Sequence, residues 1–336
     1  MDAEHGTILV TGGAGYIGSH VAKALAGAGR RVVVYDNLSA GHRGAVRWGD
    51  LVVGDIHEAD RVRETIRRHG VTAVMHFAAW LSVGESVRDP SGYYRNNVEG
   101  TLSLLRAMLA EAVTICVFSS TAAVFGNPET TPITEDHPTR PINAYGETKL
   151  AVERALGHFE TAYGLRSVAL RYFNAAGADP GGELGEAHHP EIHLIPRAIA
   201  AALGGAPLQV FGEDYETPDG TCLRDYIHVS DLADAHLRAL ARLEQGGAST
   251  VYNLGNGTPF SVREVIHSVE RVSGRRVPWT SAARREGDPG VLYASSERIR
   301  RDLLWVPRFS RLDEIVDTAW AWHTSHPAGF DDRTGR

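Results

Sequence analysis

Short apolar segments rich in β-branched residues alternate with longer helical patterns through the first half of the chain. The apolar runs predict strands at residues 7–11, 31–35, 51–53, 73–76, 114–119 and 166–171. The helical patterns between them lie at residues 18–28, 60–69, 93–110 and 145–163. Strands that alternate with helices indicate a parallel sheet with helices on both faces. Continuous apolar runs such as VVVY are typical of strands buried on both sides.

The pattern changes after about residue 175, where the predicted elements become shorter and more scattered. We therefore expect an α/β protein with two domains. Residues 1–175 should form a Rossmann-type, doubly wound parallel sheet, to which some later segments return. Residues 176–330 should form a smaller, mixed α/β domain that binds the substrate.

Composition narrows the class of protein. The chain has 336 residues and a net charge of −7, which argues against a general nucleic-acid partner. Cys116 and Cys222 lie far apart in the sequence, so buried free thiols in a reducing compartment are expected. The first residues contain no long apolar stretch, which argues against a leader or a membrane anchor. We expect a soluble, cytoplasmic protein with no membrane partner.

A glycine-rich turn after the first strand predicts a dinucleotide site. Gly12 permits the strand-to-helix turn, Gly15 lets the backbone approach a pyrophosphate, and Gly18 lets the helix pack against the strand. The free amides at the helix start favour the negative charge of the pyrophosphate. Asp36 ends the next strand, where a carboxylate accepts from the ribose hydroxyls and repels a 2′-phosphate. NAD is therefore favoured over NADP, although Arg43 is a nearby cation that can hold a phosphate.

Two later segments extend this site. Asp55 ends the third predicted strand, near the expected position of an adenine amino group. The sequence HFAA at residues 76–79 ends the fourth strand, and its small side chains allow the backbone to run beside the dinucleotide.

Three residues predict chemistry at the nicotinamide end. Thr121 lies just past the end of a strand, and Tyr145 and Lys149 share one face of the following helix because they are four residues apart. Ligands of open α/β sheets bind at the carboxyl ends of the strands, so the three side chains should meet there. A phenol has an ordinary pKa of about 10. A nearby ammonium and a positive nicotinamide are expected to lower the pKa of Tyr145, which makes the phenol a proton acceptor beside a hydride acceptor.

These residues resemble the extended branch of the short-chain dehydrogenase/reductase superfamily. Further motifs resemble the UDP-glucose 4-epimerase family and occur in its order, from the N-terminus to about residue 325. They read TGGAGYIGSH, GESV, NNVEGT, AYGETKLAVE, LRYFNAAGADP, DGTCLRDYIHVSDLADAH, YNLGNG and RREGDP.

The resemblance implies a mechanism in which NAD stays bound. Tyr145 takes the proton of the sugar 4-hydroxyl while hydride moves from C4 to NAD. The 4-keto sugar turns over, and hydride and proton return to its other face; no metal is needed. The implied cofactor site comprises Gly12, Gly15, Tyr16, Ile17, Gly18, Asp36, Asn37, Asp55, Ile56, Phe77, Ala78, Ala79, Asn96, Ser119, Tyr145, Lys149 and Tyr172.

The resemblance also implies a UDP-sugar site in the second domain. Arg224 and Arg285 would hold the diphosphate, Phe211 the uracil and Asp288 the uridine ribose; paired guanidinium forks suit phosphates. For Arg224, a salt bridge with Asp225 is the structural alternative. The implied substrate site comprises Thr121, Asn174, His193, Leu194, Phe211, Arg224, Tyr226, Arg285, Asp288 and Leu292.

Two positions depart from the family pattern. Leu81 stands where many members carry a lysine near the cofactor. Leu292 stands where members strict for glucose and galactose often carry a large tyrosine. UDP-glucose and UDP-galactose remain the expected substrates, with UDP-N-acetylhexosamines and UDP-xylose/UDP-arabinose as alternatives.

Other functions on this fold are less consistent with the residues. A sugar-nucleotide dehydratase carries Asp-Glu after the threonine, where this chain has Ala122 and Ala123. A net dehydrogenase and a non-catalytic NAD sensor remain as alternatives. Relatives suggest a homodimer through the helices at 93–110 and 145–163.

Several histidines cluster between residues 186 and 193. His188 and His189 lie close in sequence to Glu186 and Glu191, but their spacing is not a familiar ligand pattern. We therefore expect a solvated loop there and no metal site.

Overall fold

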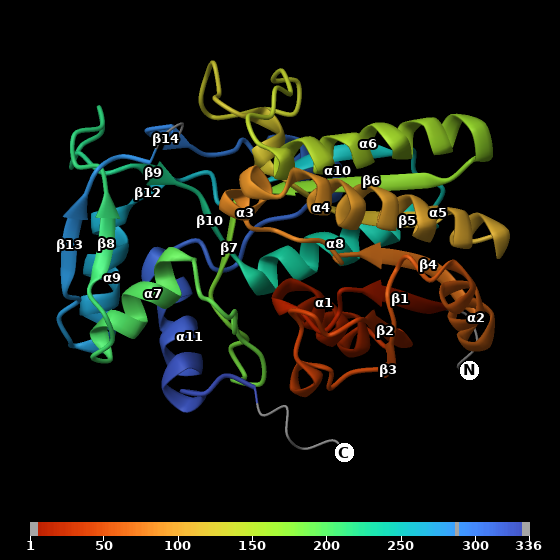
Figure 1. Ribbon diagram of the computed structural model, residues 1–336, viewed down its shortest axis with the longest axis horizontal. Helices are drawn as coiled ribbons and strands as arrows, with labels where there is room; N and C mark the ends of the chain where they lie inside the picture. Colours follow the sequence, from red (N-terminus) through yellow and green to blue (C-terminus); the bar gives the residue numbers. More distant parts are fainter. Residues whose placement is uncertain (1–5, 286–288, 331–336) are drawn as a thin grey trace.

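The computed structural model describes residues 6–285 and 289–330. Its largest element is a seven-stranded parallel sheet with the order β3-β2-β1-β4-β5-β6-β11 (Figure 1). The strands are β1 (Thr7–Thr11), β2 (Val32–Asp36), β3 (Asp50–Val53), β4 (Val71–His76), β5 (Ile115–Thr121), β6 (Arg166–Tyr172) and β11 (Thr250–Leu254). The prediction of a doubly wound parallel sheet is confirmed.

Alternate residues of each strand pack against helices on opposite faces of the sheet. Ile8 and Val10 share a core with the first pair of helices, whereas Leu9 belongs to the core under the second group. Side chains of a strand alternate between the two faces, so a strand covered on both faces must be apolar throughout. The first pair is α1 (Tyr16–Gly27) and α8 (Val229–Glu244), and the second group is α2 (Ala59–His69), α5 (Gly100–Ala110) and α6 (Ala144–Tyr163).

The helix expected at residues 93–110 is built from several pieces. Asp89 caps α4 (Pro90–Tyr93), a π-helical turn η2 follows at Tyr94–Glu99, and α5 completes the run. The helix α3 (Val83–Arg88) precedes them and is capped by Ser82, whose hydroxyl accepts from the backbone nitrogen of Glu85. Within the π-helical turn, the Asn97 side chain contacts Trp80 and Thr148, so this irregular turn joins α6 to the chain after β4.

Two elements of this lobe come from beyond residue 175. The strand β11 pairs with β6, and α8 packs against α1, so both elements belong to the lobe of the large sheet. The domain limits at residues 175 and 176 themselves stay a prediction.

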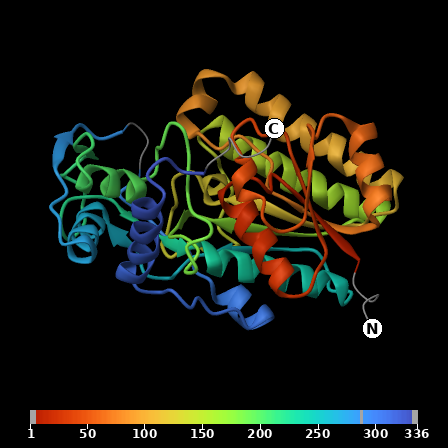
Figure 2. The same ribbon diagram turned by 90° about the horizontal axis from the view of Figure 1, so that it is seen from below.

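The second lobe is built around three small sheets and three main helices (Figures 1 and 2). Its core includes Ile195, Ile199, Val265 and Ile315, all almost completely buried. Its strands are β7 (Asn174–Ala176), β8 (Leu208–Phe211), β9 (Leu223–Arg224), β10 (Tyr226–His228), β12 (Phe260–Ser261), β13 (Trp279–Ala282) and β14 (Val291–Leu292). Its main helices are α7 (Leu194–Ala202), α9 (Val262–Ser273) and α11 (Leu312–Ser325).

Short helical segments complete the chain. They are the 3-10 turns η1 (Arg43–Ala45) and η3 (Ala122–Phe125) and the helix α10 (Glu297–Leu303) beside β11. Cys116 and Cys222 are buried free thiols, as predicted. Among the residues described, we find no helix with the length and apolar character needed to cross a bilayer.

Candidate active site

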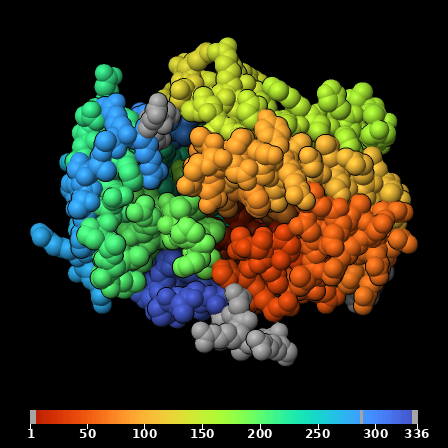
Figure 3. Space-filling model, viewed as in Figure 1, coloured from red at the N-terminus to blue at the C-terminus, as the bar shows by residue number. Residues whose placement is uncertain are grey.

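A cavity of about 430 Å³ lies at the carboxyl ends of the sheet strands and is lined by both lobes. In the space-filling view, the red and orange surface of the first lobe meets the green and blue surface of the second (Figure 3). Every residue of the predicted cofactor set lines this cavity. Of the predicted substrate set, the lining residues are Thr121, Asn174, His193, Arg224 and Leu292.

The glycine turn is tight because three backbone segments meet there. Gly12 has φ +71°, and a Cβ on it would lie 2.5 Å from the backbone nitrogen of Ala78. A Cβ on Gly18 would lie 2.4 Å from the Gly12 carbonyl oxygen. The helix α1 therefore begins directly at the sheet edge, with its first amides beside the cavity. This arrangement fits a pyrophosphate.

Asp36 is held rigidly at the end of β2. Its carboxylate accepts hydrogen bonds from the backbone nitrogens of Ala14 (3.0 Å) and Leu38 (2.8 Å). Burial raises the pKa of Asp36, and these two backbone hydrogen bonds oppose that rise. A fixed carboxylate at this place fits the ribose hydroxyls of NAD. Asp55 lies two residues past the end of β3, where it binds the side chains of Asn37 and His57.

A close approach of α6 to β5 positions the three candidate reactive residues. We call Thr121, Tyr145 and Lys149 the reactive set. Asn143 caps α6 by accepting from the backbone nitrogen of Gly146 at 2.9 Å. A Cβ on Gly146 would lie 2.5 Å from the carbonyl oxygen of Ala123, so only glycine allows this contact. Thr121 is the last residue of β5 rather than the first residue beyond it. Asn143 was not among the predicted site residues, although an asparagine before a helix is an N-cap signal.

Burial, rather than charge pairing, dominates the titration of the reactive set. The Lys149 ammonium donates to the Ser119 carbonyl oxygen at 2.8 Å, and burial lowers the pKa of Lys149 to about 7. Burial raises the pKa of Tyr145, opposed by its hydrogen bond with Thr121. In the chain without NAD, the pKa of Tyr145 is therefore raised and not lowered, and the expected effect of the nicotinamide stays a prediction. Desolvation of the phenol raises its pKa by more than the hydrogen bond with Thr121 lowers it.

The second lobe contributes Arg224 and Leu292 from neighbouring strands. The two residues are paired in register across β9 and β14 and both line the cavity. The Asp225 carboxylate instead accepts from the backbone nitrogens of Asn256 (2.7 Å) and Ala294 (3.2 Å), and burial raises the pKa of Asp225 to about 6. Backbone amides thus donate the hydrogen bonds that hold this carboxylate.

Some predicted substrate residues do not line the cavity. Arg285 lies 4.0 Å above the ring of Phe211, so these two residues are together but outside the cavity wall. Tyr226 is part of the core of the second lobe, and Leu194 packs against that core. Asp288 lies outside the described residues.

The histidine-containing loop is not solvated, contrary to our expectation. Glu186 is buried and contacts His188 and His193, whereas the exposed His189 takes no part. The loop folds back on the first lobe, where His42 bonds to the Ala187 carbonyl oxygen. The neighbouring carboxylates raise the pKa of His188 to about 9 and that of His193 to about 10 against the opposing effect of burial. The available signal in the sequence was a run of eight residues, 186–193, that contains three histidines and two glutamates.

Known proteins resemble this chain over nearly its whole length. Residues 8–255 match the model of the NAD dependent epimerase/dehydratase family. A UDP-glucose 4-epimerase of Rhizobium leguminosarum bv. trifolii is 53% identical over 318 residues, which cover 94% of this chain and 97% of that protein. One from Azospirillum brasilense is 55% identical over 320 residues, covering 95% and 92%.

Solved structures agree with this similarity. A UDP-glucose 4-epimerase from Brucella ovis in complex with NAD is 54% identical with a TM-score of 0.92, covering 94% of this chain and 97% of that one. The enzyme from Bifidobacterium longum in complex with NAD+ and UDP is 36% identical with a TM-score of 0.91, covering 96% and 100%. The chain therefore belongs to the NAD dependent epimerase/dehydratase family, among its UDP-glucose 4-epimerases.

Proposed function

We propose that this protein is an NAD-dependent 4-epimerase that interconverts UDP-glucose and UDP-galactose. The observation that carries the proposal is the convergence of Thr121, Tyr145 and Lys149 on one cavity. The same cavity contains the glycine turn on one side and Arg224 on the other. The names of the relatives that match along nearly the full length support the same reaction.

The residues around the glycine turn suit NAD. The amides at the start of α1 would hold the pyrophosphate, and the fixed Asp36 carboxylate would accept from the adenosine ribose. Lys149 would hold the nicotinamide ribose. When bound, NAD supplies the acceptor and the donor of hydride for C4 of the sugar.

Tyr145 would act on the sugar 4-hydroxyl. In its phenolate form Tyr145 would accept the hydroxyl proton and become the phenol, which later returns that proton to the same oxygen, while Thr121 hydrogen-bonds the Tyr145 oxygen and orients it. Because the phenol is desolvated, positive charge near it has a large effect on its proton affinity. Lys149 would supply part of that charge, since its pKa of about 7 leaves the amine partly protonated at neutral pH.

The second lobe would hold the nucleotide while the sugar turns over. Arg224 would bind the diphosphate, and Asn174, His193 and Leu292 would line the path to the sugar. Ala122 and Ala123 line the cavity beside Thr121 and carry no group that transfers protons, so elimination of water is disfavoured. Leu292 is smaller than a tyrosine and therefore leaves more room beside the sugar.

Proton NMR of the purified protein tests the proposal. UDP-glucose, UDP-N-acetylglucosamine and UDP-xylose are followed in separate samples without added NAD. We expect UDP-galactose to appear fastest, from UDP-glucose, with no net change in absorbance at 340 nm. A stoichiometric rise at 340 nm on adding NAD would instead indicate a dehydrogenase. No turnover with any sugar, with or without NAD, would contradict the proposal.

We also propose a cytoplasmic homodimer. The helices α3 to α6 expose Val87 and Tyr94, which are large apolar residues of the kind that subunit contacts cover. Sedimentation equilibrium would distinguish the dimer from a monomer.

A further inference from the structure

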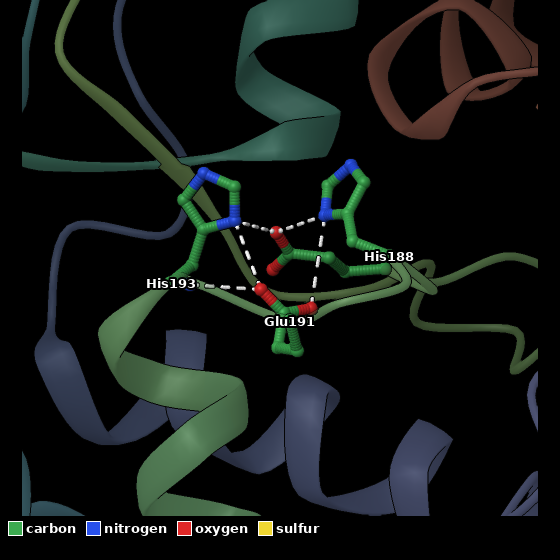
Figure 4. A group of neighbouring side chains, drawn as sticks. His188, Glu191 and His193 are labelled. Atoms are coloured by element: carbon green, nitrogen blue, oxygen red, sulfur yellow. Dashed lines mark hydrogen bonds and ion pairs between the residues drawn. The ribbon is translucent and has the colours of Figure 1, made fainter. Parts of the chain in front are cut away.

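The loop between β7 and α7 brings four potential metal ligands to one point. Glu186 and His188 come from the loop, and Glu191 and His193 come from the turn that starts α7. One ligand atom from each residue lies within 4.8 Å of every other. Figure 4 shows the rings of His188 and His193 on opposite sides, each with a nitrogen directed at the carboxylates between them.

We propose that Glu186, His188, Glu191 and His193 form a structural zinc site beside the active-site cavity. The assignment goes beyond the epimerase reaction, in which the proposed chemistry uses no metal.

The distances fit a tetrahedral ion. Nδ1 of His193 lies 2.7 Å from Glu186 Oε1 and 3.0 Å from Glu191 Oε1. Nδ1 of His188 lies 3.1 Å from Glu186 Oε1 and 3.6 Å from Glu191 Oε2. Zinc bonds to imidazole nitrogen and carboxylate oxygen are about 2.1 Å, so neighbouring ligands of a tetrahedron lie about 3.4 Å apart. The four imidazole–carboxylate contacts lie within about 0.7 Å of that spacing, and the four ligand atoms all lie within 4.8 Å of one another.

The imidazole protons alone cannot provide a hydrogen bond for every contact in this cluster. Each Nδ1 carries at most one hydrogen, yet each lies near two carboxylates. The Nδ1 atom of His188 is buried and forms ion pairs with Glu186 (3.1 Å) and Glu191 (3.6 Å), but it has hydrogen-bond geometry with neither carboxylate. A cation at the centre would meet both nitrogens and both carboxylates at once, and a divalent charge would balance the two glutamates.

The ligand set also indicates the role. Four protein ligands leave no open position, which is typical of a structural zinc rather than a catalytic one. The ion would join the loop to the start of α7. His188 packs edge-on against Tyr16 of α1 at 6.3 Å between ring centroids, so the loop with its bound ion would also contact the first lobe. It would thereby hold His193, a cavity-lining residue, in place.

Zinc binding by the full-length, tag-free protein tests the site. After dialysis against a chelator, isothermal titration with zinc chloride should give one equivalent bound per chain, and zinc should raise the Tm. Cobalt chloride should produce the visible absorption typical of a tetrahedral N/O site. Neither readout depends on turnover, so failure of this proposal is distinguishable from failure of the proposed function.

Variants at the ligands provide the decisive comparison. Glu191→Gln keeps the shape of the side chain and should weaken zinc binding at least 10-fold, as should His188→Ala. His189→Ala is the matched control, because His189 is exposed in the same loop, and it should bind as the wild type does. Far-UV circular dichroism checks that each variant is folded.

Two outcomes would overturn the zinc site. The first is a wild-type chain that takes up no stoichiometric zinc, in which case protonated imidazoles paired with the carboxylates occupy the cluster. The second is an equal zinc affinity in the wild type and in Glu191→Gln, which would show that the ion binds at another group of histidines.

Discussion

Lys149 donates a hydrogen bond from its ammonium to the backbone carbonyl oxygen of Ser119, at 2.8 Å. The contact joins the catalytic helix α6 to the end of β5. It also buries the amine, above the ring of Phe118 and beside the cavity. Burial of this charge is costly, and the cost, which the negative charge of Glu153 partly offsets, appears as the lowered pKa of Lys149.

Replacing Lys149 by methionine should stabilise the NAD-free protein at low pH. The folded-state pKa of Lys149 is about 7 against an ordinary 10.5, so burying the ammonium costs most below pH 7. The cost declines as pH rises toward 10.5, where the unfolded chain also loses the proton. We expect Lys149→Met to gain about 2 kcal/mol at pH 6 and little at pH 10. Urea unfolding at several pH values measures this difference, and epimerase activity should be lost.

Lys23→Met is the matched control for this pH dependence. Lys23 lies at the surface of α1 and pairs with Asp179 (2.6 Å) and Glu183 (2.7 Å), which raise its pKa. That stabilisation is present at neutral pH and is lost only at strongly alkaline pH. Lys23→Met should therefore destabilise the protein at pH 6. A gain in both variants would show that the buried charge is not the cause.

Tyr145→Phe should abolish turnover without loss of the fold. Removal of the phenol oxygen removes the proposed proton acceptor, so kcat should fall about 10²- to 10⁴-fold. NAD should remain bound, which absorbance of the perchloric-acid supernatant can quantify. Tyr163→Phe, at the exposed end of the same helix, should leave kcat unchanged. Wild-type turnover in Tyr145→Phe would disprove the assigned role.

Two glycines in α1 should respond in opposite ways to alanine. At Gly18 the new Cβ would meet the Gly12 carbonyl oxygen at 2.4 Å, so Gly18→Ala should destabilise the protein by about 1–3 kcal/mol and weaken NAD binding. At Gly27 no atom lies within 4 Å of the new Cβ, so Gly27→Ala should stabilise the protein by about 0.5–1 kcal/mol. Thermal unfolding and NAD content measure both effects. Similar changes in the two variants would contradict the steric explanation.

A buried ion pair beneath the reactive set should contribute strongly to stability. Glu153 on α6 pairs with Arg171 on β6 at 2.5 Å, and Ser120 also donates to this carboxylate. Glu153→Gln would leave a buried guanidinium without its counter-charge, at a cost of about 3–5 kcal/mol. The exposed pair between Glu129 and Arg140 provides the control, since Glu129→Gln should cost less than about 0.5 kcal/mol. Equal denaturation midpoints would show that the buried pair is energetically neutral.

Local features of this protein follow from its sequence. The strands β1 to β6 were predicted within two residues at each end, because apolar runs and helical periodicity are properties of neighbouring residues. The glycine turn at Gly12 and the shared face of Tyr145 and Lys149 are equally local. A left-handed φ needs glycine, and residues four apart on a helix always lie on one side.

Features that join distant segments required the tertiary structure. The strand β11 was not predicted because its place beside β6 depends on pairing across about 80 intervening residues. In the chain without NAD, the pKa of Tyr145 is raised, opposite to expectation, because burial depends on what the rest of the chain places around the phenol. The cluster of Glu186, His188, Glu191 and His193 is visible as residue types in the sequence. Only the folding of its loop onto the first lobe directs those four side chains to one point, because a loop without periodicity specifies no direction for its side chains.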